Sequence, residues 1–498
     1  MILRWFSPFR PHRFAFALLV FGVASLGLGC AQANLTSAQN AYRNGNLDGA
    51  DKWIDQYVKE QGQGVNRVIA HLEQGSIRRD QGDLQGSLAA FDVADEAITK
   101  IDRAPDVSLS RETLAAFSNL NALPYRGTYA DRIMLYVLRA LNYLELGDAD
   151  RARVELRRAY ERQRTAVQLN AEKLEAAQST AQNSSQGGGY DAQRAQQNPR
   201  FQAGLNSSYA DLNQYRGYGD YANPFAEWLQ GLYYLGEAAD GSDVERGRKS
   251  LSRAAGMVPE NNFLELDRQM AERIAAGQPT PQTTWVIFAT GTAPLRGEVR
   301  IDIPLFIFGG GVDYVGANFP RLVRNPNYIP ALAVRPVGGS ENADLQTQLL
   351  ADIDSIVAEE FKNDLPVIIT KTLIAAGTKA AASYALRETF DHRDDSLTAI
   401  VRIAATIYQY AANQADLRTW GSLPKQYQIA RLPRPDSGKI TVSPRGGVAR
   451  AASPITIDLQ PGEFNVVMVR SINTYSPLRI SQFSLGKDAP RWIEETAE

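Results

Sequence analysis

The sequence predicts a multidomain protein in which an all-α solenoid of paired helices precedes an α+β domain with antiparallel strands. Two patterns carry this prediction: apolar and small residues recur at helical spacing through the first half of the chain, and the spacing becomes strand-like after Gly277. With 498 residues, the chain is also too long for a single core. We therefore assign 1–29 to a signal peptide, 30–277 to the helical domain and 278–498 to the α+β domain.

The composition is that of a globular protein and excludes several classes of function. Apolar residues make up 44% and charged residues 22% of the chain, and the net charge of −2 gives no electrostatic basis for a nucleic-acid partner. The single cysteine excludes a disulfide framework and a thiolate metal site within the chain. We expect no metal, no cofactor and no nucleic acid to bind.

The first 29 residues have the pattern of an export signal. Arg4, Arg10 and Arg13 precede an apolar run from Phe14 to Gly29. This run has about 16 residues, fewer than the roughly 20 that a helix needs to span a bilayer. The segment is therefore expected to direct export and not to remain as a transmembrane helix.

Two processing sites compete at the end of the signal. The tripeptide Ala31-Gln32-Ala33 fits ordinary secretion with cleavage after Ala33. The stretch 26–30, Leu-Gly-Leu-Gly-Cys, resembles the lipobox of bacterial lipoproteins, although Gly27 stands where leucine is usual. Because Cys30 is the only cysteine of the chain, we expect it to carry the lipid. No aspartate follows Cys30, and by the same resemblance this favours an outer-membrane lipoprotein that faces the periplasm.

Asp131 to Arg162 is the clearest pair of helices. Apolar residues recur at helical spacing on both sides of Gly147, which takes the place of a left-handed residue at a helix end. The stretch resembles a 34-residue tetratricopeptide repeat (TPR) at its aromatic, small and turn positions: Tyr136, Ala140, Tyr143, Gly147, Ala152, Leu156 and Ala159. Further copies lie at about 41–54, 75–94 and 228–259, so we predict a TPR-like solenoid.

Residues 176–219 interrupt the repeats with a polar low-complexity insert. The insert is rich in Ala, Gln, Asn, Ser and Gly, and the residues that lead into it, Val167 to Gln178, continue a helical pattern. Its apolar surface is too small to offset the entropy of ordering the chain. We expect the insert to be mobile beyond the end of that helix.

After Pro279 the sequence predicts strands, then helices, then strands again. The strands are expected at 285–288, 298–303, 312–319, 439–442, 454–459 and 463–472. Apolar periodicity predicts a helix over Asp344–Phe361, a second helix that starts near Pro366 and a buried third helix over Ser396–Asn413.

Three stretches resemble one family of proteins. They are Tyr125-Arg126-Gly127 with the central repeat, Gly291-Thr292-Ala293-Pro294 with the strand after it, and the ten residues ADLRTWGSLP from Ala415 to Pro424. Together they are similar to a family of bacterial envelope lipoproteins of unassigned function with a TPR-like N-terminal part. The resemblance implies a place in the cell envelope, and it carries over no catalytic residue.

The residues that most catalysis needs are scarce. Outside the signal, His71 takes a packing place in a repeat, and His392 lies in a charged connection, where a solvated loop is the simpler interpretation than a metal ligand. Ser422 and Lys425 have the S-x-x-K spacing of penicillin-recognising enzymes, but Pro424 disfavours the helical turn that this mechanism needs. We therefore predict that the protein is not an enzyme.

Arg151, Arg158 and Arg162 are the candidate partner-binding residues. They belong to a cluster of arginines on the second helix of the central repeat. If they face the concave groove of the solenoid, they can hold carboxylates of a partner through bidentate hydrogen bonds. A solvated helix face with weak, exposed ion pairs is the simpler interpretation.

These patterns predict an envelope scaffold or adaptor that binds a protein or peptide partner in the concave groove of the repeats. A hydrolase of envelope polymers that uses Glu298 and Asp302 is the alternative, and it requires two carboxylates about 5–9.5 Å apart. The helices over 362–413 are a candidate surface for oligomer formation. We expect Trp420 and Arg418 to fix the link before the closing strands onto the core.

Overall fold

The computed structural model describes residues 33–103, 123–186, 190–219, 221–306, 312–338, 344–390, 415–446 and 454–491. Four predicted features lie outside these ranges: the signal at 1–29, the lipid-attachment residue Cys30, His392 and the helix over Ser396–Asn413. Within the described ranges, no helix combines the length and the apolar character needed to cross a membrane.

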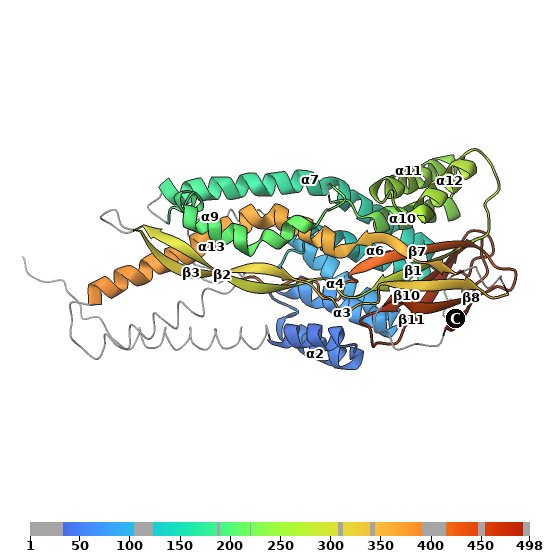
Figure 1. Cartoon of the computed structure of the whole chain (residues 1–498), viewed down its shortest axis with the longest axis horizontal. Helices are drawn as coiled ribbons and strands as arrows, with labels where there is room; N and C mark the ends of the chain where they lie inside the picture. Colours follow the sequence, from blue (N-terminus) through green and yellow to red (C-terminus); the bar gives the residue numbers. More distant parts are fainter. Residues whose placement is uncertain are drawn as a thin grey trace, which may run out of the picture.

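Helical hairpins form the N-terminal part of the described chain, as the sequence predicts (Figure 1). Residues 33–43 are helical and lead into the first labelled helix. The helices are α2 (Leu47–Gln61), α3 (Arg67–Gln81), α4 (Leu84–Arg103), α6 (Tyr129–Glu145), α7 (Ala149–Gln186), α10 (Pro224–Gly236), α11 (Gly241–Met257) and α12 (Asn262–Ala275). In the hairpins α3 packs on α4, α6 on α7 and α10 on α11, and α12 packs on α11.

Glycines close the hairpins and bring their helices together. Gly45, Gly82 and Gly147 follow the first helices of three hairpins with φ angles of 78°, 90° and 82°, a left-handed conformation that glycine adopts without strain. The paired helices then approach closely, since a Cβ atom on Gly75 of α3 would lie 2.3 Å from the ring of Phe91 on α4. The predicted turn at Gly147 is confirmed.

A five-stranded mixed sheet follows the helices. Its strands, in the order β11-β10-β1-β7-β6, are β11 (Arg479–Leu485), β10 (Phe464–Ser471), β1 (Thr283–Thr290), β7 (Gln426–Pro433) and β6 (Gln348–Asp352). The pair β1 and β10 runs parallel, and the other neighbours in this sheet run antiparallel as predicted. A four-stranded sheet has the order β5 (Leu345–Gln346), β4 (Ala331–Pro336), β8 (Lys439–Arg445) and β9 (Ile455–Asp458).

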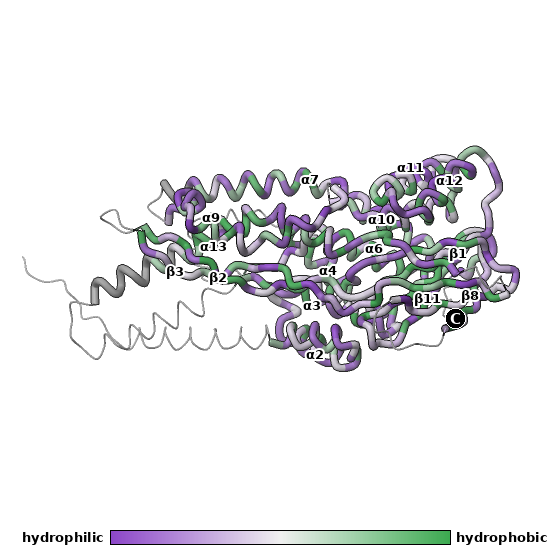
Figure 2. The backbone as a smooth tube through the Cα atoms, in the orientation of Figure 1, coloured by the Kyte–Doolittle hydropathy of each residue, from purple (hydrophilic) through white to green (hydrophobic). Residues whose placement is uncertain are grey.

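The helices and both of these sheets share one hydrophobic core, which continues across the predicted domain boundary between residues 277 and 278. All 8 residues of β1 and all 8 of β10 are buried, so both faces of the five-stranded sheet are covered. The first helices of the hairpins cover one face: Phe225 of α10 stacks on Tyr427 of β7 with ring centroids 3.9 Å apart. Leu332 of β4 and Ile440 of β8 belong to the same buried cluster. Figure 2 shows more hydrophilic residues on the outer helices α11 and α12 than along β1.

A second, smaller core forms an arm that extends from this body (Figure 1). The arm consists of α7 beyond residue 163 and of α8 (Ala192–Gln196), α9 (Pro199–Ser208), η2 (Ala210–Gln214), β2 (Leu295–Phe306), β3 (Val312–Val323) and α13 (Ile353–Phe390). The strands β2 and β3 form a two-stranded antiparallel hairpin that contacts α9 and α13.

The prediction of a mobile insert at 176–219 is wrong for its described residues, 176–186 and 190–219. The helix α7 has 38 residues and continues to Gln186, and the residues after 190 fold into α8, α9 and η2. Their larger apolar side chains are buried in the arm: Tyr190, Phe201, Leu205, Tyr209, Leu212 and Tyr215. Burial against β2, β3 and α13 supplies the free energy that the polar composition alone lacks.

Two predicted helix boundaries are also wrong. The predicted helix over Asp344–Phe361 begins only at Ile353, because residues 348–352 form β6 and pair with β7. Pro366 lies inside α13, which is one helix of 38 residues, and does not begin a new helix. The strands β4, β7 and β11 were not predicted.

The close approach of α3 and α4 predicts that Gly75→Ala is destabilising. The added methyl group meets the buried ring of Phe91, and overpacking of this kind costs about 1–3 kcal/mol in free energy of unfolding. The matched control is Gly256→Ala in α11, where an added Cβ has no neighbour within 4 Å. There, alanine should leave stability unchanged or raise it by up to about 1 kcal/mol. Urea unfolding of the two variants measures both effects, and equal stability would contradict the close packing.

Candidate functional site

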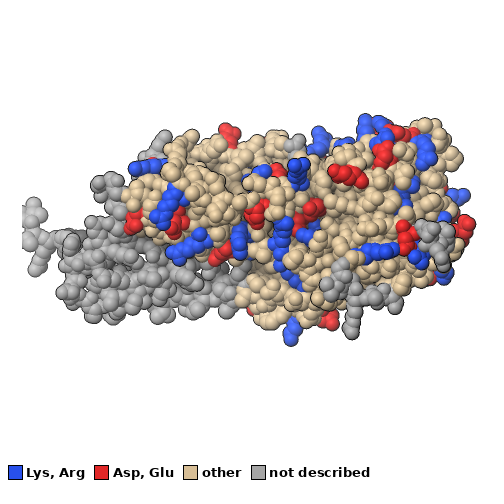
Figure 3. All heavy atoms as spheres, viewed as in Figure 1, with Lys and Arg blue, Asp and Glu red and all other residues tan. Residues whose placement is uncertain are grey.

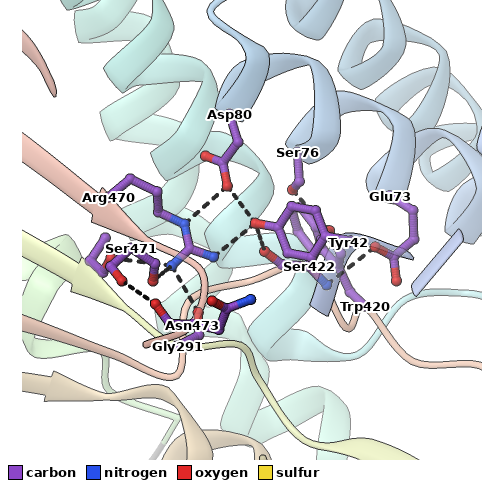
Figure 4. A network of polar contacts seen from close by, with 11 residues as sticks. Tyr42, Glu73, Ser76, Asp80, Gly291, Trp420, Ser422, Arg470, Ser471 and Asn473 are labelled. Carbon is purple, nitrogen blue, oxygen red and sulfur yellow. Dashed lines mark hydrogen bonds and ion pairs between the residues drawn. The ribbon is translucent and has the colours of Figure 1, made fainter. Parts of the chain in front are cut away.

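The link between α13 and β7, residues 415–424, lies against the inner face of α3 (Figure 4). Trp420 is 1% exposed, and its Nε1 donates to Oγ of Ser76 at 3.0 Å. Its ring meets the ring of Phe91 edge-on, with centroids 5.9 Å apart. The prediction that Trp420 fixes this link onto the core is confirmed.

Glu73 of α3 holds the backbone of the same link. Its Oε1 accepts the N–H of Gly421 at 2.7 Å, and its Oε2 accepts the N–H of Ser422 at 3.2 Å. Gln39, in the helix over residues 33–43, donates to Oε1 at 2.7 Å. Burial raises the pKa of Glu73, while these donors act in the opposite direction. The helix therefore binds a turn in a distant segment of its own chain through a buried carboxylate.

Arg418 fastens the start of the link to the turn before α3. Its Nη1 donates to Oδ1 of Asn66 at 3.0 Å and to the carbonyl of Leu123 at 2.9 Å. Its Nη2 lies 2.8 Å from Oδ2 of Asp416. Burial raises the pKa of Asp416, but the adjacent guanidinium outweighs it and holds that pKa below its usual range. The predicted structural role of Arg418 is confirmed.

A second polar cluster joins the first two hairpins to β10 (Figure 4). Arg470 of β10 donates from Nε to Oδ2 of Asp80 at 3.0 Å and from Nη2 to the hydroxyl of Tyr42 at 2.8 Å. Its Nη1 donates to the carbonyls of Gly291 and Ser471, each at 2.8 Å. Each guanidinium nitrogen thus has a partner within the chain, which makes Arg470 a structural residue.

A cavity of about 390 Å³ remains between α3, α6 and the strands β10 and β11. Its apolar wall includes Leu138 and Leu141 of α6 and Met468 of β10. Of the charged lining residues, Arg79 pairs with Glu145 and Asp80 pairs with Arg470. Arg479, at the start of β11, is exposed and has no ion-pair partner among the described residues. The volume lies in the range of small-molecule or side-chain pockets.

The three candidate arginines of the central repeat lie on α7, the outer helix of its hairpin, and not on the inner face that the sheet covers. Each has a carboxylate partner in the chain: Arg151 pairs with Asp148 at 3.4 Å, Arg158 with Asp95 at 3.2 Å and Arg162 with Asp102 at 3.1 Å. Arg158 and Arg162 thereby connect α7 to α4. Their contact with a partner stays a prediction, and such a partner would compete with these ion pairs.

The two carboxylates of the hydrolase hypothesis lie in the arm. Oε1 of Glu298 accepts the N–H of Ala415 at 2.9 Å, and Asp302 pairs with Arg200 at 2.8 Å. They are four residues apart on β2, which separates them by about 13 Å along the strand. This pair does not meet the separation that the hydrolase hypothesis requires.

The other residues singled out from the sequence have ordinary surroundings. His71 is 7% exposed, and its Nδ1 lies 3.1 Å from the side chain of Gln74. Ser422 lies in a turn rather than a helix, and Lys425 pairs with Asp354. In the part of the chain that the structure describes, no group of three or more His, Cys, Asp or Glu could hold a metal ion.

Sequence analysis missed two further buried carboxylates that connect distant segments. Asp267 of α12 is 0% exposed and accepts hydrogen bonds from the indoles of Trp228 and Trp285, both at 2.9 Å. Burial raises its pKa to about 6. Glu360 of α13 is 3% exposed and accepts the N–H of Ala130 at 2.8 Å in the first turn of α6. The only sequence signal for such residues is a single acid on the apolar side of a helix.

Comparison with known proteins adds little to this description. No protein-family model matches the chain, and no curated protein matches it. The solved structure of a tetratricopeptide repeat protein from Parabacteroides merdae ATCC 43184 is similar over 49% of this chain and 98% of its own length. The sequence identity is 11% and the TM-score 0.14, so the fold and function have to be argued from the contacts of this chain.

The buried position of Trp420 predicts a large loss of stability for Trp420→Ala. Removing a fully buried tryptophan costs about 3–5 kcal/mol in free energy of unfolding. Trp53→Ala is the control, because Trp53 on α2 is 39% exposed and its removal should change stability by only about 0.5 kcal/mol. Thermal and urea unfolding distinguish the two. Similar small losses for both would mean that the link is not held as described.

From the raised pKa of Glu360 we predict that the stability of the protein depends on pH. Burial, with the nearby charge of Asp364, raises its pKa from 4.5 to about 7. An acid whose folded-state pKa is raised favours folding below its unfolded pKa, and this contribution is lost as the pH rises through about 7. Glu360→Gln cannot ionise. The stability of the natural protein relative to this variant should therefore fall by up to about 3 kcal/mol between pH 5 and 8. The shifted pKa of Asp267 is common to both proteins, so a constant difference across this range would contradict the prediction.

Proposed function

We propose that the protein is a non-enzymatic scaffold of the bacterial cell envelope, anchored by a lipid on Cys30 in the outer membrane and facing the periplasm, which binds a protein or peptide partner. The observation that supports this proposal most is the contact between α3 and the link 415–424. There, a helical hairpin already binds a non-helical chain segment, through Glu73 and the buried indole of Trp420. Repeats that recognise a chain segment in this way can act by shape, without bond-making.

The contact also changes where a partner can bind. The sequence predicts a partner in the concave groove of the repeats, but the inner face of the first helices is covered by the five-stranded sheet and the link. The opening left beside them is the cavity between α3, α6 and β11. Its apolar wall suits a hydrophobic side chain of the partner, and Arg479 at its edge suits an acidic group next to that side chain.

The anchor is tested by Cys30→Ser. In the natural protein, we expect incorporation of labelled palmitate, accumulation of the precursor when globomycin blocks lipoprotein processing, and a lipid-modified cysteine as the first residue by mass spectrometry. Cys30→Ser should lose the label and leave the membrane fraction. An N-terminus at Asn34, the result of ordinary cleavage after Ala33, would refute the anchor.

The binding site is tested by a photocrosslinking residue at Ser481, which lines the cavity. The control position is Leu266 on α12, which is exposed and lies away from the cavity. We expect one defined protein adduct in intact cells from position 481 only. Leu141→Trp, which fills the cavity from α6, should reduce this adduct at least about tenfold while the folded protein persists. An adduct that is equally strong from both positions, or insensitive to Leu141→Trp, would argue against the cavity.

A further inference from the structure

The short distance between Cys30 and the first described helix limits the orientation of the protein on a membrane. This inference rests on the proposed lipid at Cys30. Two residues separate Cys30 from residue 33, where the first described helix starts, and the three Cα-to-Cα steps between them span about 10 Å at most. A bilayer that holds the lipid must therefore pass within about that distance of residue 33.

Residue 33 lies at the end of the body from which the arm extends. Asn34 donates to Glu60, in the last turn of α2, at 2.8 Å. The N–H of Tyr125, just before α6, donates to the carbonyl of Val65, just before α3, at 2.8 Å. The start of α6 in turn binds Glu360 of α13. These contacts place the chain entry, the starts of α3 and α6 and the base of the arm at one end of the hairpins.

The arm extends far beyond this end (Figure 1). From Glu360, α13 continues to Phe390, which is about 45 Å at 1.5 Å per residue. From Lys173, which pairs with Asp364 of α13, α7 continues to Gln186, about 20 Å further. A lipid within about 10 Å of residue 33 cannot reach the tip of either helix. The molecule therefore cannot stand upright on its arm with the lipid inserted.

We propose that the arm lies along the surface of the bilayer that holds Cys30, so that the long axis of the molecule is roughly parallel to the membrane. The bilayer plane has to pass close to residue 33 without cutting through the protein, and the arm projects past that point along the long axis of the molecule (Figure 1). The occupant of the surface beside the arm is thus the lipid headgroup layer of the anchoring membrane. The short anchor dictates this contact.

Charge makes a minor contribution to the contact. Arginines and acids are interspersed on the face seen in Figure 3, with no field of one sign. Arg300 and Arg321 of the β2–β3 hairpin are exposed without an ion-pair partner among the described residues, but exposed Asp313 lies on the same hairpin. We therefore expect the arrangement to be the same on neutral and anionic lipid, and to persist at high salt.

The test uses the lipidated full-length protein in vesicles. Cys30 is the only cysteine, and its thiol is consumed by the lipid, so an introduced cysteine is the single reactive thiol. Val312→Cys places a nitrobenzoxadiazole label at the far end of the arm hairpin. Leu266→Cys places it on α12 at the opposite end of the molecule (Figure 1). Both native residues are 42% exposed, which makes them a matched pair.

We measure quenching of the label by a spin-labelled headgroup in phosphatidylcholine vesicles, with and without phosphatidylglycerol. The label at 312 should be quenched at least about twofold more than the label at 266, in both lipids and at high salt. Equal quenching, with mass spectrometry showing the lipid in place, overturns the orientation and leaves the anchor standing. A mature protein without lipid overturns both.

Discussion

The packing of the repeats against the sheet depends on the burial of Glu73. A carboxylate removed from water is strongly destabilising unless its oxygens find donors. Here those donors include the backbone N–H groups of Gly421 and Ser422, 348 and 349 residues further along the chain. The bond fixes the link immediately before Gln426, where β7 begins, and so sets where β7 lies beside β1. Helices and sheet therefore cannot separate at this point without leaving the buried carboxyl group of Glu73 without its donors.

The same arrangement recurs at two other contacts between distant segments. Asp267 joins α12 to α10 and β1 through two indoles, and Glu360 joins α13 to the first turn of α6. In each case a helix contributes one buried acid and a distant segment contributes the donors. These three contacts connect the body with the base of the arm through buried hydrogen bonds. A partner is then expected to meet a preformed surface, without the opening of a hinge.

Local signals in the sequence were sufficient to predict the helical hairpins. They were insufficient to predict the long-range contacts. Gly147 could be placed at a turn because the requirement for a left-handed residue is local. Residues 201–215 keep a helical spacing of apolar side chains, but the polar residues around them concealed that the arm would cover them. The apolar periodicity of residues 345–353 fits a helix. Part of this stretch nevertheless forms the strand β6, because it pairs with β7. No local pattern reports that Glu73 faces a link more than 340 residues away.

The sheet covers the inner face of the repeats for a physical reason that can be read from the sequence. The strands β1 and β10 are apolar on both faces, and a sheet of this kind is stable only when something covers each side. The smaller sheet covers one side, and the apolar inner surface of the helical hairpins is large enough to cover the other. A solenoid followed by strands that are buried on both faces is therefore poorly suited to keep its groove free for a partner. Under the proposed scaffold function, the partner would therefore be recognised at the cavity beside β11, which the packing leaves open.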